Sequence, residues 1–297
     1  MDFNIWGQTL SSIRKNKNIP INEIIGDHLT RSAYSRFAAG KTNTSIDNFA
    51  YMLYHLHVSF EEFNYIKNQY EPDKYHLLLK DAQEATHQYN ISQLIKIMNK
   101  FKSYAEVTND MEPYHLYCIV KLTINKLNNE PYDQQAKSII TNYLTHCESW
   151  SHYELVLFNN VMFIFDLNLI IVMKKKVIHN LEKYQNLRSY GSESFRVLIN
   201  ILTMFLDQEH INQALFLFTE IEDFPLRADM FFEKTLKRYF RGILKMIENK
   251  NEINAELAES LDIFKLISKK DYYISFTAYK EKIKRIYNID DAKKLQQ

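Results

Sequence analysis

Apolar residues recur at helical spacing along almost the whole chain, and few residues interrupt them. The 297 residues include only five glycines and five prolines, a composition that favours long helices over a turn-rich sheet protein. We therefore predict an all-α protein. From residue 75 onward the pattern predicts amphipathic helices at 75–88, 91–107, 113–128, 132–147, 151–167, 169–187, 192–207, 210–222, 226–249, 253–269 and 271–287.

The first 65 residues have a different pattern, which predicts short helices separated by tight turns. Residues 3–17 place apolar side chains close to one helix face. A short helix would end at Gly26, and Thr30 is suited to cap a following helix that Gly40 ends. This is the spacing of a helix-turn-helix module. Its core is expected to continue through a third helix with Ile46, Phe49, Met52, Leu53 and Leu56.

The second helix of this module would turn polar side chains outward while Ala33 and Phe37 face inward. In a DNA major groove an arginine can fork onto guanine, and a serine can donate or accept a hydrogen bond. Basic residues beside such a helix are suited to contact phosphates, which orient the protein without specifying sequence. We expect base contacts from Arg31, Ser32, Ser35 and Arg36, and phosphate contacts from Arg14, Lys15 and Lys41.

Charge supports this interpretation locally. Residues 1–45 contain six Lys/Arg and three acidic residues, whereas residues 46–65 add three acidic residues and no basic one. The whole chain has a net charge of only +1, so DNA affinity would have to come from a local patch, doubled by dimerisation. The alternative is a small helical bundle with a solvated basic face.

The segment LTRSAYSRFAAGKTNTSIDNFAYMLYHLHVSFEEF, residues 29–63, resembles the end of an Xre-type (lambda-repressor-like) helix-turn-helix. It resembles still more closely the Rgg/MutR family of regulators, which includes ComR-like competence regulators. The resemblance rests on SRF-x-x-GK (35–41), L-x-V-S-x-E-E-F (56–63) and W-G-x-x-L-x-x-I-R-K (6–15). Ala38 departs from the family pattern, which usually has an acidic residue there. We expect this change to remove a contact within the module and to leave DNA binding intact.

Four of the later predicted helices begin with an aromatic residue. These residues are Tyr114, Tyr153, Phe195 and Phe232, at intervals of 39, 42 and 37 residues. A period in this range is typical of helical hairpins that stack into a solenoid. The sequence therefore predicts a TPR-like superhelix, with a single irregular helical bundle as the alternative.

These patterns divide the chain into three parts: a helix-turn-helix DNA-binding domain at 1–65, a polar linker at 66–74, and a TPR-like domain at 75–297. The last segment is rich in tyrosine. Because the final helix of a solenoid exposes an end that needs a cap or a partner, we expect a homodimer contact there, with intramolecular capping as the alternative.

The stretch C-x-x-W-S-H-Y-E-L-x-L-F-N-N, residues 147–160, resembles the middle of the Rgg/MutR regulatory domain. The resemblance implies that the helical array binds a short, mostly hydrophobic signalling peptide on its concave face. Asparagine can satisfy peptide amides, and arginine, including Arg241, can hold a carboxylate. We expect peptide contacts from Tyr153, Asn160, Phe163, Arg196, Asn200, Phe205, Arg238 and Tyr239. For each of them, ordinary packing or solvation is the alternative.

No catalytic or metal-binding pattern accompanies these features. The sequence lacks G-x-S-x-G, Walker, G-x-G-x-x-G and H-E-x-x-H motifs, so we expect neither enzymatic activity nor a cofactor. Cys118 and Cys147 have no zinc-ligand spacing, and free thiols are expected in a reducing compartment.

The most hydrophobic stretch, residues 155–173, is interrupted by three asparagines and an aspartate. Such groups are costly in lipid, so a buried helix hairpin is expected in place of a membrane span. The N-terminus has no secretion signal, and we expect a cytoplasmic protein.

Together these inferences predict a transcription regulator that binds double-stranded promoter DNA as a homodimer and is switched by a short hydrophobic peptide. Two alternatives remain at this stage. One is an Xre-type DNA-binding protein whose helical domain only dimerises or binds a protein partner. The other is a helical scaffold with a vestigial N-terminal module.

Overall fold

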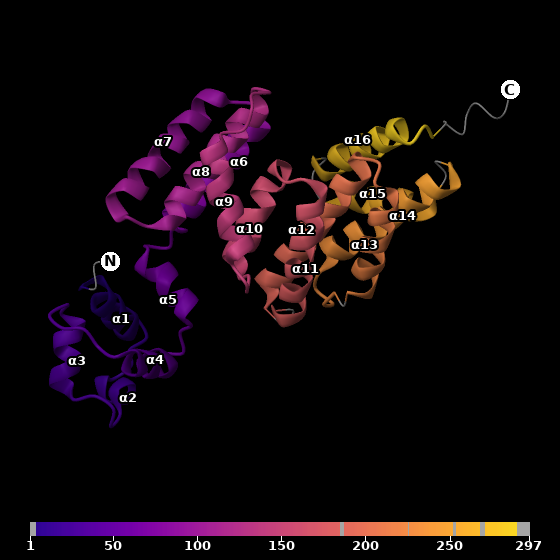
Figure 1. Cartoon of the computed structure of the whole chain (residues 1–297). Helices are drawn as coiled ribbons and strands as arrows, with labels where there is room; N and C mark the ends of the chain where they lie inside the picture. Colours follow the sequence, from indigo (N-terminus) through magenta and orange to yellow (C-terminus); the bar gives the residue numbers. More distant parts are fainter. Residues whose placement is uncertain (1–3, 185–186, 225, 252–253, 268–270, 290–297) are drawn as a thin grey trace. The chain divides into compact units, whose positions relative to one another are not determined.

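The computed structural model describes residues 4–184, 187–224, 226–251, 254–267 and 271–289. These residues form helices joined by turns, and none of them lies in a β-strand (Figure 1). The chain divides into two compact units, residues 1–90 and 91–297. The predicted all-α class is confirmed.

The first unit is a set of short helices whose core lies between residues 10 and 66. Leu10, Ile24, Leu56 and Phe63 are fully buried in it. Its helices are α1 (Asn4–Asn16), α2 (Ile21–Ile25), α3 (Arg31–Ala38), α4 (Ile46–His55), α5 (Phe60–Lys67) and α6 (Lys74–His87).

Side-chain caps explain where the helices of this unit begin. Thr30 Oγ1 accepts a hydrogen bond from the Ala33 N–H at 3.2 Å, and so caps α3. Ser59 and Glu62 form a reciprocal capping box at the start of α5, with bonds of 2.7 and 3.0 Å. Each cap satisfies N–H groups that have no partner within the helix. Thr30 therefore caps the helix that the sequence predicted it would cap.

The prediction for α4 is correct except for Ile46. Phe49, Met52, Leu53 and Leu56 are buried, but 71% of Ile46 is exposed. Ile46 is the first residue of α4, directly after the cap Ser45. Its spacing of three and seven residues from Phe49 and Leu53 places it near the same helix face, so its exposure follows from its position at the end of the helix.

The predicted linker, residues 66–74, overlaps the ends of two helices. Helix α5 extends to Lys67 and α6 begins at Lys74. Residues 68–70 form a turn, in which Gln69 and Tyr70 have positive φ angles. The Asp73 side chain accepts from the Tyr75 N–H at 2.8 Å and starts α6.

The second unit is a succession of longer helices that pack as antiparallel pairs (Figure 1). Its helices are α7 (Ile91–Thr108), α8 (Met111–Leu127), α9 (Gln134–His146), α10 (His152–Val161), the 3₁₀ turn η1 (Met162–Ile164), α11 (Leu167–Tyr184), α12 (Arg188–Asp207), α13 (Ile211–Asp223), α14 (Phe231–Asn249), α15 (Ala255–Ile267) and α16 (Asp271–Ile286).

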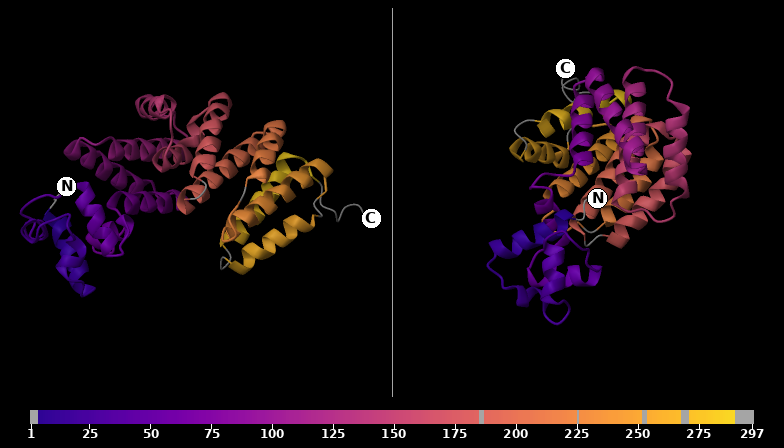
Figure 2. Two further views of the ribbon diagram at one scale, coloured as in Figure 1. Left: turned by 90° about the horizontal axis from the view of Figure 1, so that it is seen from below. Right: turned by 90° about the vertical axis from the view of Figure 1, so that its left-hand side faces the viewer.

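Helices α8, α10, α12 and α14 form one layer, in which each contacts the next. Helices α8, α12 and α14 each also pack against the odd-numbered helix that follows in the chain. Helix α10 instead packs against α9, which precedes it, and against the η1 turn. Figure 2 shows these stacked hairpins from two further directions. The four helices of this layer are those that the sequence singled out by their aromatic residues. The repeat architecture is therefore confirmed.

Several predicted helix boundaries differ from the structure, two of them by five residues or more. The helix expected at 151–167 ends at Val161, and the Asp166 carboxylate accepts from the Leu169 N–H at 2.9 Å, which caps α11. The helix expected at 226–249 begins at Phe231, because residues 226–230 form turns. Across the described residues, no helix is long and apolar enough to cross a membrane.

Helix α16 packs back onto the even-numbered layer. The Tyr287 hydroxyl donates to the Leu206 carbonyl at 3.0 Å, and the Tyr279 hydroxyl approaches the Thr203 carbonyl at 3.5 Å. These bonds tie α16 to α12. The tyrosine-rich end of the chain thus packs against the helical array of its own chain. Other apolar side chains of the same end remain exposed.

Candidate functional sites

Helix α3 presents the polar set that the sequence predicted. Tyr34 and Phe37 are buried in the core of the first unit, whereas Ala33 is half-buried. The four residues on the remaining surface of α3 are all exposed: Arg31, Ser32, Ser35 and Arg36. A short capped helix with one apolar and one polar face can lie in a groove of DNA without exposing the core.

The two arginines of this helix are held by neutral partners. Arg31 Nε donates to Asn22 Oδ1 at 3.1 Å, and Arg36 donates to Ser32 Oγ at 3.1 Å. Neutral hydrogen bonds leave the guanidinium charge uncompensated. Both side chains are therefore oriented and remain cationic toward a ligand.

The three residues predicted to contact phosphates differ in exposure and in hydrogen bonding. Arg14 is half-buried and donates to the Tyr34 hydroxyl at 3.1 Å and to the Ile19 carbonyl at 2.6 Å. It therefore links α1 to α3 and to the turn before α2. Lys15 and Lys41 are exposed.

Sequence reasoning missed the residue that sets the distance between α1 and α3. A Cβ atom on Gly7 would lie 1.8 Å from the Phe37 carbonyl oxygen, which is backbone of α3. Only glycine permits this approach. Gly7 falls within the opening family motif, and that was the one available signal.

On the second unit, α10 and α12 meet through an asparagine pair. Asn200 Nδ2 donates to Asn159 Oδ1 at 2.7 Å. Asn160 instead donates to the Val156 carbonyl of its own helix at 2.8 Å. Asn160 and Asn200 were the predicted peptide contacts, but the side chain that bonds Asn200 is that of Asn159. Its separation from Asn200 matches the repeat length, which is the signal that could have identified it.

Arg196 lies one turn before Asn200, next to α14. Its guanidinium is 5.5 Å from the centre of the Phe232 ring and 3.7 Å from the Glu233 carboxylate. Glu233 is buried and also accepts from Ser192 Oγ at 2.5 Å. Arg196 is exposed along its remaining surface. We call Asn159, Asn160, Arg196 and Asn200 the asparagine stripe.

Tyr153 belongs to a network between α8, α9 and α10. Its hydroxyl shares a hydrogen bond of 2.8 Å with Nδ1 of the buried His115. Beside them, the Tyr143 hydroxyl donates to Glu154 at 2.6 Å. Burial raises the pKa of Tyr153 and lowers the pKa of His115, the latter against an opposing effect of Glu154. Tyr153 is thus a half-buried, neutral hydrogen-bonding group.

The aromatic residues expected to line peptide pockets differ in exposure. Phe163 is half-buried, 5.7 Å from the Tyr132 ring and 4.3 Å from Lys126 Nζ. Phe205 and Tyr239 are 1% and 0% exposed. The Tyr239 hydroxyl donates to the Phe276 carbonyl of α16 at 2.7 Å. Both of these residues are part of the core between helices.

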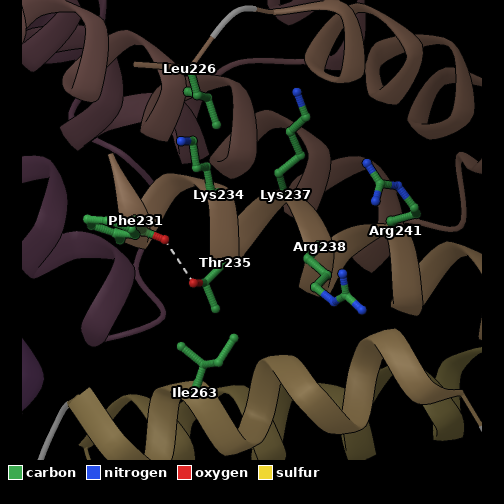
Figure 3. Close-up of a pocket in the computed structure, with 8 residues that line it drawn as sticks. All are labelled: Leu226, Phe231, Lys234, Thr235, Lys237, Arg238, Arg241 and Ile263. Atoms are coloured by element: carbon green, nitrogen blue, oxygen red, sulfur yellow. Dashed lines mark hydrogen bonds between the residues drawn. The ribbon is translucent and has the colours of Figure 1, made fainter. Parts of the chain in front are cut away.

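Arg238 and Arg241 line a hollow of about 470 Å³ beside α14. Figure 3 shows Leu226 and Ile263 on opposite sides of a row of basic side chains. Arg238 pairs with Glu259, and Arg241 pairs with Glu222. The complete lining is Leu226, Phe231, Lys234, Thr235, Lys237, Arg238, Arg241 and Ile263. We call this hollow the α14 pocket.

The structure does not bring Arg238 together with the asparagine stripe. Arg196 touches Phe232 and Glu233, and Tyr239 points toward α16. Arg238 follows Glu233 by five residues, which places it about 140° away around the helix. Sequence periodicity placed Phe232, Glu233 and Arg238 on one helix but did not separate the side of α14 that meets Arg196 from the side that lines the pocket.

Among the described residues, no group of three or more His, Cys, Asp or Glu side chains is arranged to hold a metal ion. Cys118 is buried and Cys147 half-buried, and both thiols are free. Burial raises the pKa of the Cys118 thiol to about 12, which keeps it protonated and unreactive at neutral pH.

Comparisons with known proteins agree on one family. Residues 98–278 match the family described as HTH-type transcriptional regulator Rgg, C-terminal domain. RopB is 32% identical, with 76% of this chain and 99% of RopB covered and a TM-score of 0.57.

Two further solved structures share the fold over nearly their whole length. A putative transcriptional regulator from Listeria monocytogenes is 18% identical, with a TM-score of 0.84 over 97% of this chain and all of that one. The SHP pheromone receptor Rgg2 of Streptococcus dysgalactiae is 21% identical, with a TM-score of 0.74 over 93% and 99% of the two chains.

Proposed function

Because the chain belongs to the family of Rgg HTH-type transcriptional regulators, we propose that it binds promoter DNA as a dimer and is switched by a short apolar peptide. DNA is bound by the first unit and the peptide by the second. The observation that carries this proposal is the exposed polar face of α3, with two arginines free of acidic partners.

On DNA, α3 lies in the major groove. Arg31, Ser32, Ser35 and Arg36 face base edges, and Lys15 and Lys41 face phosphates. Arg14 acts chiefly by fixing α1 against Tyr34. Two copies reading half-sites about one helical turn apart double the small positive patch.

A dimer contact through the end of the chain is supported by exposed apolar side chains. Leu266 is 84% exposed, and Ile267 and Ile274 are more than half exposed. They lie at the end of α15 and the start of α16. An apolar group of this kind at the end of a solenoid is suited to a second copy.

The peptide lies along the asparagine stripe, which supplies amide donors and acceptors, with Tyr153 and Phe163 as its aromatic neighbours. The Rgg2 neighbour is a pheromone receptor, which supports a peptide as the ligand class. Phe205, Arg238 and Tyr239 are left out of this contact set because of their positions in the core or on the other sector of α14. The peptide switches the protein through different affinities for two dimer states.

The test is fluorescence anisotropy with the full chain on the promoter fragment beside its own gene, over a salt series. Synthetic peptides encoded by small neighbouring reading frames are added in turn. We expect specific, salt-dependent binding that one peptide changes. Replacing Arg31 and Arg36 by Ala should weaken specific binding at least tenfold, since each guanine contact contributes about 1–3 kcal/mol. Asn200→Ala should weaken the peptide response about fivefold through a lost hydrogen bond of about 1 kcal/mol.

Two controls match these variants. Lys96→Ala with Lys100→Ala removes two exposed charges from α7, and Asn142→Ala removes an exposed amide from α9; neither should change binding. Specific binding that ignores every peptide would favour a helical domain that only dimerises or binds a protein. Absence of specific binding would reject the DNA assignment.

A further inference from the structure

The α14 pocket has the size and lining of a small-molecule site. Its volume of about 470 Å³ lies within the range of about 300–1,000 Å³ common for ligand pockets. Four of its eight lining residues are cationic and none is acidic. The row of basic groups in Figure 3 is therefore the dominant chemical feature of the pocket.

Two of the four cations have neutral partners in the structure. Lys237 Nζ donates to the Glu222 and Phe224 carbonyls at 2.6 and 3.2 Å, and Lys234 Nζ donates to the Ala228 carbonyl at 3.2 Å. Carbonyl oxygens orient an ammonium group without cancelling its charge. Burial, and secondarily the nearby Arg241 charge, lowers the pKa of Lys237 against the opposing charges of Glu222 and Asp223. A bound anion would relieve this crowding of positive charge.

The two arginines are only partly neutralised. Arg238 pairs with Glu259, which is itself mostly solvent-exposed, and Nε of Arg238 is buried without a hydrogen-bond partner. Arg241 is shared between Glu222 and, at 3.6 Å, Glu256. This N–H is an unused donor on a residue that lines the pocket, and it can bond an oxygen if the side chain turns toward the ligand.

Three of the other four lining residues are apolar and reach solvent, whereas Thr235 is buried and donates to the Phe231 carbonyl. Phe231 is 74% exposed and Ile263 is 36% exposed, on two sides of the basic row. Leu226 completes this rim. Exposed aromatic and branched side chains beside a cationic group suit a ligand with an anionic head and a compact apolar body.

We propose that the α14 pocket binds a small organic anion, a carboxylate or phosphate carried on a compact apolar body. The head lies between Lys237, Arg238 and Arg241, and the apolar body lies against Phe231 and Ile263. This site is separate from the asparagine stripe, because it occupies the other open sector of α14. The proposal therefore goes beyond the peptide switch and does not depend on it.

A second hollow of about 460 Å³, lined by α11, α13 and Phe205 of α12, provides an internal comparison. There Lys174 Nζ lies 2.6 Å from the Glu220 carboxylate, so its charge is cancelled within the lining. Lys175 lines the same hollow and is exposed. This hollow should not select an anion, and Lys175 is a matched position for a control variant.

The experiment is isothermal titration calorimetry of the full chain with 3-phenylpropionate, phenyl phosphate, inorganic phosphate and the uncharged 3-phenylpropanol. We expect binding of the two amphipathic anions that weakens with added salt, weaker binding of inorganic phosphate, and none of the alcohol. Lys234→Gln with Lys237→Gln should weaken binding of the anions at least tenfold. Lys175→Gln should leave it unchanged.

Because Lys237 also holds the end of α13, Lys234→Gln alone serves as a second variant at an exposed residue. It should weaken binding about threefold without changing the circular dichroism spectrum. Failure of every anion to bind, equal binding of the alcohol, or unchanged affinity in the double variant would each overturn the proposal. Asn200→Ala should leave anion binding unchanged, because the two sites are separate. A failure of the peptide proposal can therefore be distinguished from a failure of the anion proposal.

Discussion

At the scale of single residues, the position of α3 depends on Gly7 having no Cβ atom. Gly7 lets α1 approach the α3 backbone, and a Cβ there would overlap the Phe37 carbonyl. Arg14 then closes the same contact by bonding Tyr34 and Ile19. The exposed face of α3 is thus held by two residues that do not lie on it.

Gly7→Ala should destabilise the first unit, because backbone of α3 must move to make room. We expect a loss of about 1–3 kcal/mol, the usual range for overpacking. The reporter is Trp6, which packs against Phe49 and Phe63. Its fluorescence can be followed during urea unfolding in a common Trp150→Phe background.

Ser12→Ala is the control, since Ser12 is an exposed residue of the same helix. It should change the free energy of unfolding by less than about 0.5 kcal/mol. Equal stability of the Gly7→Ala and Ser12→Ala chains would mean that α1 and α3 are not in close contact.

At the scale of helices, the chain ends many elements without glycine. Asn18, Asn109, Asn129 and Asn288 follow helices and have φ angles between 51° and 54°. Asparagine is the residue that most readily replaces glycine in this left-handed conformation. Asparagine takes this conformation after four helices, and residues such as Tyr89, Glu209 and Lys250 take it after others, so the chain forms its hairpins with only five glycines.

The contact between α8 and α10 should make the second unit sensitive to pH. Burial lowers the pKa of His115 in the folded chain, so the unfolded chain binds its proton more readily. Stability is therefore full above the ordinary pKa of about 6.5 and is lost as the pH falls through it. Between pH 7.5 and 5.5 we expect the contribution of this histidine to fall by up to about 1.4 kcal/mol.

Urea unfolding of the full chain at several pH values measures this change. His115→Asn should flatten the dependence relative to the unaltered chain, while His146→Asn, at an exposed position, should not. A pH dependence that is the same in all three chains would assign the effect to other groups. The groups facing His115 are Tyr143, Tyr153 and Glu154.

At the scale of the whole molecule, charge is distributed unevenly although it nearly cancels. The net charge is +1, but residues 1–45 carry twice as many basic as acidic residues. The affinity of the first unit for DNA should therefore fall with added salt, and the slope of that fall is set by the number of phosphates that the first unit contacts.

Lys15→Gln and Lys41→Gln should each weaken binding to specific and nonspecific DNA alike. Each should reduce the slope of log affinity against log salt by about one. Anisotropy titrations at four salt concentrations measure the slope, with Lys100→Gln on α7 as the control. A loss confined to the specific sequence would instead place these lysines at base edges.

Much of the architecture was predictable because its causes are local. Helix type follows from apolar spacing, and starts such as those at Thr30 and Ser59 follow from side chains that bond nearby N–H groups. The repeat was visible because stacked hairpins of equal size place similar aromatic residues at similar intervals. The exposed face of α3 was predictable for a similar reason, because the helical spacing of Ala33 and Phe37 sets which side faces the core.

Only the tertiary structure decided which surface each outward residue belongs to. Arg196 and Arg238 are both arginines on even-numbered helices, yet one borders the asparagine stripe and the other lines the α14 pocket. Phe205 and Tyr239 are both buried, and the Tyr239 hydroxyl bonds to the Phe276 carbonyl of α16. Periodicity fixes which way a side chain points from its own helix axis. What it meets there depends on neighbouring helices that are distant in the chain, and no local pattern encodes them.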